Sequence, residues 1–551
     1  MHGSTSAFCT ADAPTDFRLS VKRKITCSRG SGNKPLAKHW HHSTRSSYLP
    51  CSRREFLRGF LLTAGVVFGG DRFSSTLATS APSSDLEIFT AEQTRNLYQF
   101  SLANGARFVV FERKNTPTVS FTSFVRVGAV DEPDGKTGMA HFLEHLAFKG
   151  TRRLGTKNWA EESRLLCQLD ALYEKWRTQP DSVRDEIQSL SRRAEAFVDE
   201  NAFGRLVQRN GGVGLNAATE ADSTQYFYNM PSNKLELWFA LESERFKDPV
   251  FRAFERERRV ILEERLLRVE NDDIGKFLEK LLQVTFERHP YRRPVIGYKN
   301  DIEKLTPADV RSFFREHYTA NRLTFAIVGD VEHERVRDYA ERYFSDLPNS
   351  PLALRGKSSD LTEPAQQTAK RFEMDLSSNP ICVVAYRVPP FQHEDTAPLR
   401  VMADLLDGGR LSRLYRALVE TGMASSASFS LGFPGERFAN LGMFLALPSP
   451  GQNMQKILEE WEHIIKMLLI PNNISEQEIQ RVRKRVRVSL LNAIMDNSEM
   501  AGLLGKFASM TGDALELFRF LERIGTVRRE DISRVAEKYL RSENSVTGLI
   551  V

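Results

Sequence analysis

The sequence has little cysteine and no long hydrophobic stretch. Only 5 of its 551 residues are cysteine, and three of these precede residue 52. The other two, Cys167 and Cys382, are too few and too far apart for a disulfide framework, so we expect both to be small buried hydrophobic residues. An apolar stretch covers residues 59–70. It is too short to cross a bilayer as a permanent helix, which needs about 20 residues.

The sequence also lacks a large excess of either charge. The whole chain carries +6, of which residues 1–81 carry +8, so residues 82–551 carry −2. A nearly neutral body gives no electrostatic basis for binding nucleic acid. Apolar residues make up 41% of the chain and charged residues 27%, which is typical of a globular protein with sizeable cores.

The basic residues lie in a segment that has the composition of a targeting sequence. Residues 1–50 are rich in Ser, Thr, Lys and Arg, and we interpret them as a transit peptide or a disordered extension. Residues 51–81 combine Ser-Arg-Arg-Glu-Phe-Leu-Arg, a short apolar stretch and a run of small residues. This combination predicts a twin-arginine export signal. Two explanations fit a signal that begins at residue 51. The one we favour is a plastid transit peptide that precedes a thylakoid-lumen signal. The other is a bacterial protein whose start site was placed too early, and it would be exported to the periplasm.

The remaining sequence reads as two similar halves. Residues 118–127 are strand-like and residues 137–148 are helical, and residues 381–387 and 398–406 repeat this order. The recurrence predicts duplication of an α+β unit, and therefore an α+β fold. We predict an N-terminal domain over residues 82–348, a linker over 349–363 and a C-terminal domain over 364–551.

An additional helical segment interrupts the first half at about residues 160–206. Leu165, Leu169 and Leu172 recur at helical spacing, and a second periodic run follows Gln179–Asp181. This pattern predicts a helical hairpin with its turn at those three residues. A packed antiparallel arm and a substrate gate or subunit contact are both compatible with it.

A His-x-x-Glu-His motif lies inside the predicted helix at residues 137–148. His141, Glu144 and His145 share one face, because an α-helix turns once per 3.6 residues. Two imidazoles at this spacing can bind one metal ion, and zinc suits imidazole and carboxylate ligands with one open position. Zinc lowers the pKa of water, and Glu144 can accept the proton. The motif is that of an inverted zinc protease; the alternative is an exposed helix face with an incidental ion pair.

The flanking sequence resembles the M16 peptidases. Residues 138–151 are similar to the active-site helix of that family, and residues 215–219 with Tyr226 resemble its substrate-binding edge strand. Residues 255–264 resemble the helix that carries the third zinc ligand. The resemblance extends over about residues 94–551 and is greatest to exported bacterial members with two domains.

The resemblance implies a ligand set for one zinc ion per chain. It implies that His141, His145 and Glu264 bind the metal and that Glu144 is the catalytic general base. It also implies that Glu257, seven residues before Glu264, is a second catalytic-site carboxylate behind the ligands.

The resemblance also implies how a peptide binds. Asn216 and Ala217 would bind the substrate backbone, because an extended peptide adds to a sheet edge through main-chain hydrogen bonds.

Glu263 remains the rival third ligand, about 100° around the helix from Glu264.

The sequence departs from the family in the second half. Many members carry an Arg and a Tyr there that help to grip the substrate. Val419 and Ser425 stand at those positions in this chain. Arg413 and Arg416 are candidates to replace the missing arginine, and the alternative is that both are ordinary charges on a helix surface.

These features together imply a zinc endopeptidase that acts on peptides or unfolded polypeptides in an exported or luminal compartment. The family architecture implies pairing with a second copy or a related chain, as a homodimer or heterodimer. The alternative is a catalytically inactive M16-like structural or partner subunit.

Overall fold

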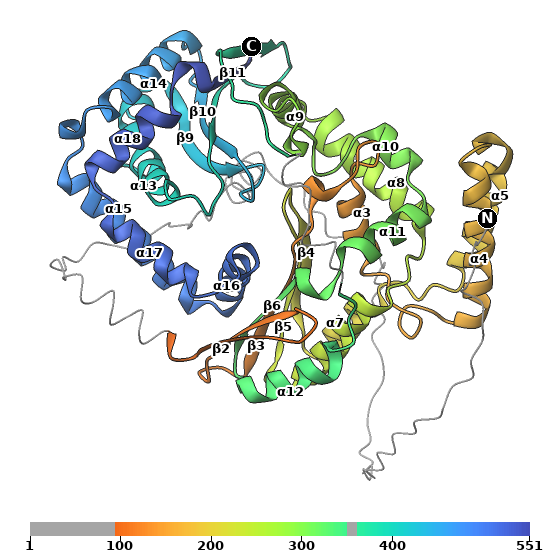
Figure 1. The fold of residues 1–551 in the computed structure, drawn as a ribbon. Helices are drawn as coiled ribbons and strands as arrows, with labels where there is room; N and C mark the ends of the chain where they lie inside the picture. Colours follow the sequence, from red (N-terminus) through yellow and green to blue (C-terminus); the bar gives the residue numbers. More distant parts are fainter. Residues whose placement is uncertain (1–93, 350–360) are drawn as a thin grey trace, which may run out of the picture. The chain divides into compact units, whose positions relative to one another are not determined.

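The computed structural model describes residues 94–349 and 361–551 (Figure 1). The predicted transit peptide, the export signal and most of the linker lie outside these residues. Among the helices of the two described ranges, none is both long and apolar enough to cross a membrane.

The N-terminal half is built on a six-stranded sheet with the order β1-β2-β6-β3-β5-β4. Strands β2 and β6 are parallel, and all other neighbours are antiparallel. β4 therefore forms one edge of the sheet. The strands are β1 (Leu97–Ser101), β2 (Arg107–Glu112), β3 (Thr118–Val125), β4 (Val213–Thr219), β5 (Thr224–Pro231) and β6 (Leu323–Gly329).

The C-terminal half repeats this topology with one strand fewer. Its sheet has the order β7-β11-β8-β10-β9, with β7 and β11 parallel and the rest antiparallel. This pattern matches β2-β6-β3-β5-β4 strand for strand, so β9 is the counterpart of β4. The strands are β7 (Lys370–Met374), β8 (Ile381–Val388), β9 (Ala424–Phe433), β10 (Asn440–Pro448) and β11 (Ser545–Ile550).

Both faces of the first sheet are covered, because successive side chains of a strand point to opposite sides. On one face, Phe121 stacks on Trp238 of α7 (Leu235–Lys247), with 4.5 Å between ring centroids. On the other face, Val109 and Val328 join a hydrophobic cluster that includes Leu504 of helix α16 (Asn497–Thr511). Central strands covered on both faces explain the apolar sequence of β6.

Helix α16 (Asn497–Thr511) connects the two halves, because it belongs to the C-terminal half but packs on β3 and β6. A Cβ added at Gly505 would lie 2.4 Å from the ring of Phe124, so the helix needs glycine there to approach the sheet. Arg107 donates to the carbonyl of Ala508 at 3.0 Å. Helix α16 contacts β3 and β6 as well as α15 and α17, so its buried residues do not form the single apolar stripe that predicts a surface helix.

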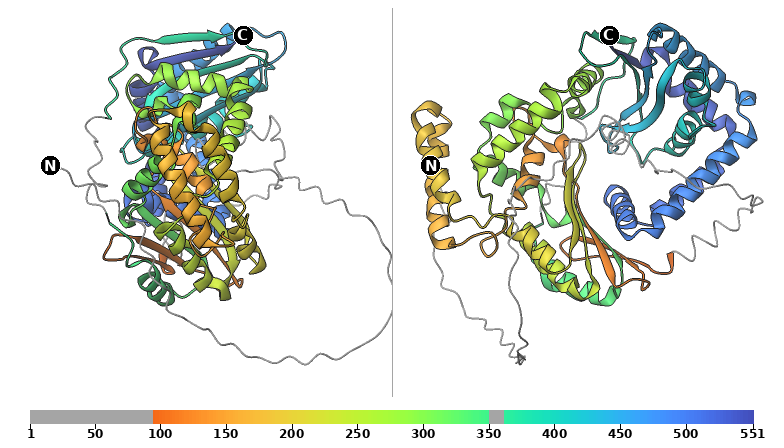
Figure 2. Two further views of the ribbon diagram at one scale, coloured as in Figure 1. Left: turned by 90° about the vertical axis from the view of Figure 1, so that its right-hand side faces the viewer. Right: turned by 180° about the vertical axis from the view of Figure 1, so that it is seen from behind.

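The predicted hairpin is present as α4 (Trp159–Trp176) and α5 (Pro180–Glu195), and Figure 2 shows it (gold) from two further sides. Its predicted turn was misplaced. Pro180 is the first residue of α5, where a proline needs no hydrogen-bonded N–H and has a suitable φ. The predicted segment also includes a separate helix, α6 (Ala202–Arg209).

The expectation for cysteine holds for only one of the two residues. Cys382 is buried in β8, whereas Cys167 lies on the exposed face of α4. The prediction that Cys167 is buried is therefore wrong, because Leu165 and Leu169 occupy the inward positions of that helix.

Further helices complete both halves. Those of the N-terminal half are α3 (Met139–Leu146), α8 (Phe254–Arg265), α9 (Asp273–Thr285), α10 (Lys299–Lys304), α11 (Pro307–His317) and α12 (His333–Phe344). Those of the C-terminal half are α13 (Thr396–Asp407), α14 (Met454–Leu468), α15 (Glu476–Met495), α17 (Glu516–Thr526) and α18 (Arg529–Tyr539).

Candidate metal centre

Helix α3 presents the His-x-x-Glu-His motif on its less buried face. Phe142 and Leu143 are fully buried in the core, which fixes the rotation of the helix about its axis. The helix begins after Gly138, whose φ of +83° favours glycine. A Cβ at this position would also lie 2.6 Å from the carbonyl oxygen of Ile296.

Glu132 anchors the amino end of α3. Its buried carboxylate accepts hydrogen bonds from the backbone N–H of Gly138 at 2.9 Å and of Ala140 at 2.8 Å. Burial raises the pKa of Glu132 to about 8, although the two N–H donors and Arg293 act against this shift. The position of the motif therefore depends on a buried carboxyl group outside the motif.

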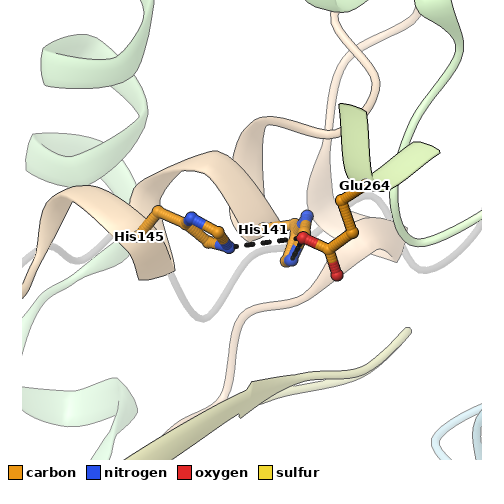
Figure 3. A group of neighbouring side chains, drawn as sticks. All are labelled: His141, His145 and Glu264. Atoms are coloured by element: carbon orange, nitrogen blue, oxygen red, sulfur yellow. Dashed lines mark ion pairs between the residues drawn. The ribbon is translucent and has the colours of Figure 1, made fainter. Parts of the chain in front are cut away.

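The structure brings His141, His145 and Glu264 together, as Figure 3 shows. Glu264 Oε2 lies 3.8 Å from His141 Nε2 and 3.7 Å from His145 Nε2. Zinc–ligand bonds of about 2.0–2.1 Å at tetrahedral angles place donor atoms about 3.3 Å apart. The observed spacing is only slightly wider, and the donor set of two imidazoles and one carboxylate leaves a fourth position open. These residues therefore fit a zinc ion.

The protonation of His141 suits a ligand role. Burial lowers its pKa to about 3, and the nearby His145 and Arg268 act in the same direction. A neutral imidazole keeps the nitrogen lone pair that a metal ion requires. His141 is therefore ready to bind a cation at neutral pH.

Glu264, rather than its neighbour Glu263, reaches the two histidines. Both lie on α8, but Glu263 is exposed and belongs to no metal-ligating group among the described residues. Arg268 pairs with the other oxygen of Glu264 at 2.9 Å, one helical turn further on. This ion pair orients the carboxylate with Oε2 towards the imidazoles.

Glu257 lies behind His145, on the side away from Glu264. Its Oε2 is 3.6 Å from His145 Nδ1, and its Oε1 is 2.5 Å from Lys149 Nζ. Burial raises the pKa of Glu257, but the contacts with His145 and Lys149 outweigh burial and lower it overall. An ionised carboxylate at this position orients the ring of a metal-binding histidine.

Glu144 lies on the same face of α3 as the two histidines, but its carboxylate contacts strand β4. Its Oε2 accepts a hydrogen bond of 2.5 Å from the hydroxyl of Thr219 at the end of β4. Burial raises the pKa of Glu144, and Glu264 adds to this shift, while Thr219 and His145 oppose it. Within the described residues, no hydrogen bond occupies the other oxygen, Oε1.

Asn216 and Ala217 lie on β4, the edge strand beside α3. The outer side of β4 faces no other strand of the sheet. The N–H of Ala217 is occupied by the side chain of its own neighbour, because Asn216 Oδ1 accepts it at 2.9 Å. A peptide that adds to this edge must displace that contact.

The helical hairpin braces the site from behind. Glu162 of α4 pairs with Arg252 at 2.7 Å, and both side chains are almost completely buried. Arg252 also donates to the carbonyl groups of Lys149 at 3.0 Å and Thr151 at 2.5 Å, directly after α3. Tyr173 of α4 donates to a glutamate in the first turn of α8. The sequence is compatible with a packed antiparallel arm and with a substrate gate or subunit contact, and these contacts favour the packed arm.

The matching position in the C-terminal half holds an ion pair instead of metal ligands. When residues 137–150 are aligned with residues 396–409, Arg400 and Asp404 of α13 stand opposite His141 and His145. Arg485 of α15 donates to Asp404 Oδ1 through Nε at 3.0 Å. A guanidinium group therefore neutralises Asp404, and no group of side chains that could hold a metal ion lies among the described residues 361–551.

The candidates to replace the substrate-gripping arginine differ in their surroundings. Arg413 pairs with Glu478 at 3.1 Å and donates to the carbonyl of Asn473 at 2.7 Å, so it has a structural role in the C-terminal half. Arg416 is exposed. Ser425, where the family has tyrosine, is exposed on β9.

A second group of metal-ligating side chains has a simpler explanation. Glu112, His333 and Glu334 lie close together. Glu112 Oε1 accepts both the backbone N–H of His333 at 2.7 Å and its ring Nδ1 at 2.8 Å, at the first residue of α12. Glu112 therefore caps a helix, and its oxygen is already used.

The sequence interpretation missed several residues that support the site. Lys149 and Thr219 lie inside stretches that resembled the M16 family but received no role. Arg268 could have been found from its spacing of four residues after Glu264. Glu132 could not, because only the fold shows that its side chain reaches α3.

The fold and the site define a two-sheet α+β protein with two imidazoles and one carboxylate placed to suit a zinc ion. A family model described as Insulinase (Peptidase family M16) matches residues 108–166, which contain the motif, and one described as Peptidase M16 inactive domain matches residues 304–486. Models of the M16 peptidases thus match residues in both halves of the chain.

Relatives of similar length also resemble this chain. Zinc protease PqqE of Helicobacter pylori is 25% identical over 453 residues, which are 81% of this chain and 91% of that protein. The mitochondrial-processing peptidase subunit beta of Lentinula edodes is 25% identical over 487 residues, 84% of this chain and 92% of that protein. The crystal structure of a protease from Helicobacter pylori has a TM-score of 0.68 at 24% identity and covers 83% of this chain and 99% of its own.

Proposed function

We propose that this protein is a zinc-dependent endopeptidase that hydrolyses peptides or unfolded polypeptides. The observation that carries the proposal is the convergence of His141, His145 and Glu264 beside the carboxylate of Glu144. The similarity to proteins named as zinc protease and processing peptidase supports it.

In the proposed reaction the chain's own residues bind the peptide and move the proton. When bound by the three ligands, zinc supplies an electrophilic centre that makes water more acidic. Glu144 accepts a proton from a water molecule at its free Oε1 as the water oxygen bonds to the peptide carbonyl carbon. It then donates that proton to the amide nitrogen as the C–N bond breaks. The edge of β4 binds the peptide backbone by adding a strand, which requires few particular side chains. We therefore expect broad sequence tolerance.

We further propose that a second chain completes the enzyme. Val419 and Ser425 replace the arginine and tyrosine that many M16 members use to grip the substrate, and Arg413 is held by Glu478. A homodimer, or a heterodimer with another M16 chain, would supply an enclosing surface. The twin-arginine motif supports export, with the thylakoid lumen favoured over the periplasm.

Cleavage of a quenched peptide library tests the proposal. The purified chain is assayed with zinc, with a chelator and as the Glu144→Gln variant, which keeps all three ligands. We expect zinc-dependent cleavage that the variant loses while it still binds one zinc ion. A chain that binds zinc but cleaves nothing, alone or with a related chain, would support the inactive-subunit alternative.

A further inference from the structure

We propose that the hydroxyl of Thr219 positions the general base Glu144 and ties it to the strand on which the peptide binds. This inference rests on the proposed function and adds a positioning residue to it. Thr219 is the last residue of β4, and its Oγ1 donates to Glu144 Oε2 at 2.5 Å. A hydrogen bond to a charged group is short and strong, so it can select one orientation of the carboxylate.

The hydrogen bond leaves Glu144 suitably arranged for proton transfer. With Oε2 held by Thr219, the rotation of the carboxylate is fixed and Oε1 is the oxygen that remains available. Without the hydroxyl, the side chain of Glu144 could rotate about its terminal torsion, which is broad for glutamate. Thr219 thus acts on the reaction through another residue.

One short segment holds both partners of this contact. The backbone N–H groups of Ala129 and Val130 donate to the carbonyls of Glu220 and Ala221 in the turn after Thr219, at 3.2 and 2.9 Å. Glu132, two residues further, accepts the N–H groups at the start of α3. The segment therefore sets the distance between β4 and α3 that the hydrogen bond needs.

The C-terminal half also fixes this turn. Asp222 accepts hydrogen bonds from the N–H of Glu436 at 2.5 Å and of Arg437 at 2.8 Å, both in the turn between β9 and β10. The hydroxyl of Tyr291 donates to the same carboxylate at 2.5 Å. Thr219 therefore lies on a strand end that is anchored on two sides, and a small change at its side chain should not move the strand.

The test compares Thr219→Val, which keeps the β-branched shape without a donor, with Thr219→Ser, which keeps the donor. Thr118→Val is the matched control, because Thr118 is an exposed residue of the same sheet whose hydroxyl contacts only Thr116 among the described residues. For Thr219→Val we expect kcat to fall roughly 10- to 100-fold, the loss typical of a hydrogen bond to a charged group. KM and zinc stoichiometry should stay unchanged, and Thr219→Ser should restore most of kcat.

Equal kcat in Thr219→Val and wild type would overturn the inference, as would a loss confined to KM or shared equally by Thr219→Ser. Crystal structures of the zinc-loaded variants give a readout that does not need turnover. Glu144 should keep its orientation in wild type and Thr219→Ser and lose it in Thr219→Val, and an unchanged orientation would refute positioning. A wild-type chain that binds zinc without cleaving peptides would refute the proposed function, while this structural comparison would still decide the role of Thr219.

Discussion

Replacing Glu162 with glutamine tests whether the helical hairpin braces the metal centre. The carboxylate of Glu162 is the charged partner of Arg252, and their side chains are 1% and 0% exposed. Removing one partner of a buried ion pair typically costs about 3–5 kcal/mol, because the other charge stays buried. Arg252 keeps its three backbone carbonyl partners in the variant, so we expect a loss near the lower end, about 3 kcal/mol.

The matched control is Asp170→Asn, on the same helix. Asp170 pairs with Arg311 at 2.7 Å, but both side chains are about 40% exposed. Exposed ion pairs contribute about 0–1 kcal/mol. Urea unfolding of the zinc-free chain gives both free energies. If the free energies of unfolding of the two variants differ by less than about 1 kcal/mol, the buried ion pair between Glu162 and Arg252 does not anchor the hairpin as the structure indicates.

Three further predictions concern the ligands and a buried carboxylate. Glu264→Gln should abolish tight zinc binding in a competitive chelator titration, while Glu263→Gln should not; equal effects would place the third ligand elsewhere. Glu257→Gln should weaken zinc binding about 10- to 100-fold, as is usual for a residue that orients a ligand; unchanged affinity would show that Glu257 does not orient His145. Asp395→Asn should lower the free energy of unfolding at pH 7, and this cost should shrink progressively as the pH falls below about 4. Burial raises the pKa of Asp395, but hydrogen bonds from Lys538, Tyr539 and Arg534 outweigh burial and lower the pKa below its value in the unfolded chain. The ionised side chain therefore stabilises the fold above the unfolded-state pKa, and this stabilisation is lost as the pH falls through the folded-state pKa. A cost that is independent of pH would contradict this explanation.

The motif and the recurring strand-then-helix order were accessible from the sequence because they depend on local spacing. His141, Glu144 and His145 share a face in any α-helix, and the strand-then-helix order recurs in both halves. The choice between Glu264 and Glu263 needed the rotation of α8, which residues far along the chain determine. The structure places Glu264 in the metal group and leaves Glu263 exposed.

Other features depend on contacts between distant residues. Helix α16 packs on strands that lie far earlier in the sequence, and the contact between Arg107 and Ala508, which are 401 residues apart, is an example. Thr219 approaches Glu144 only after β4 takes the edge position beside α3. The turn of the hairpin was misplaced for a local reason, because proline begins a helix as readily as it interrupts one.

Anomalous diffraction at the zinc absorption edge, on crystals grown with zinc, tests the central claim most directly. We predict one strong peak per chain, within bonding distance of His141 Nε2, His145 Nε2 and Glu264 Oε2. Absence of a peak there, or a peak only at Glu112 and His333, would contradict the assignment of the zinc centre and the peptidase function proposed for it.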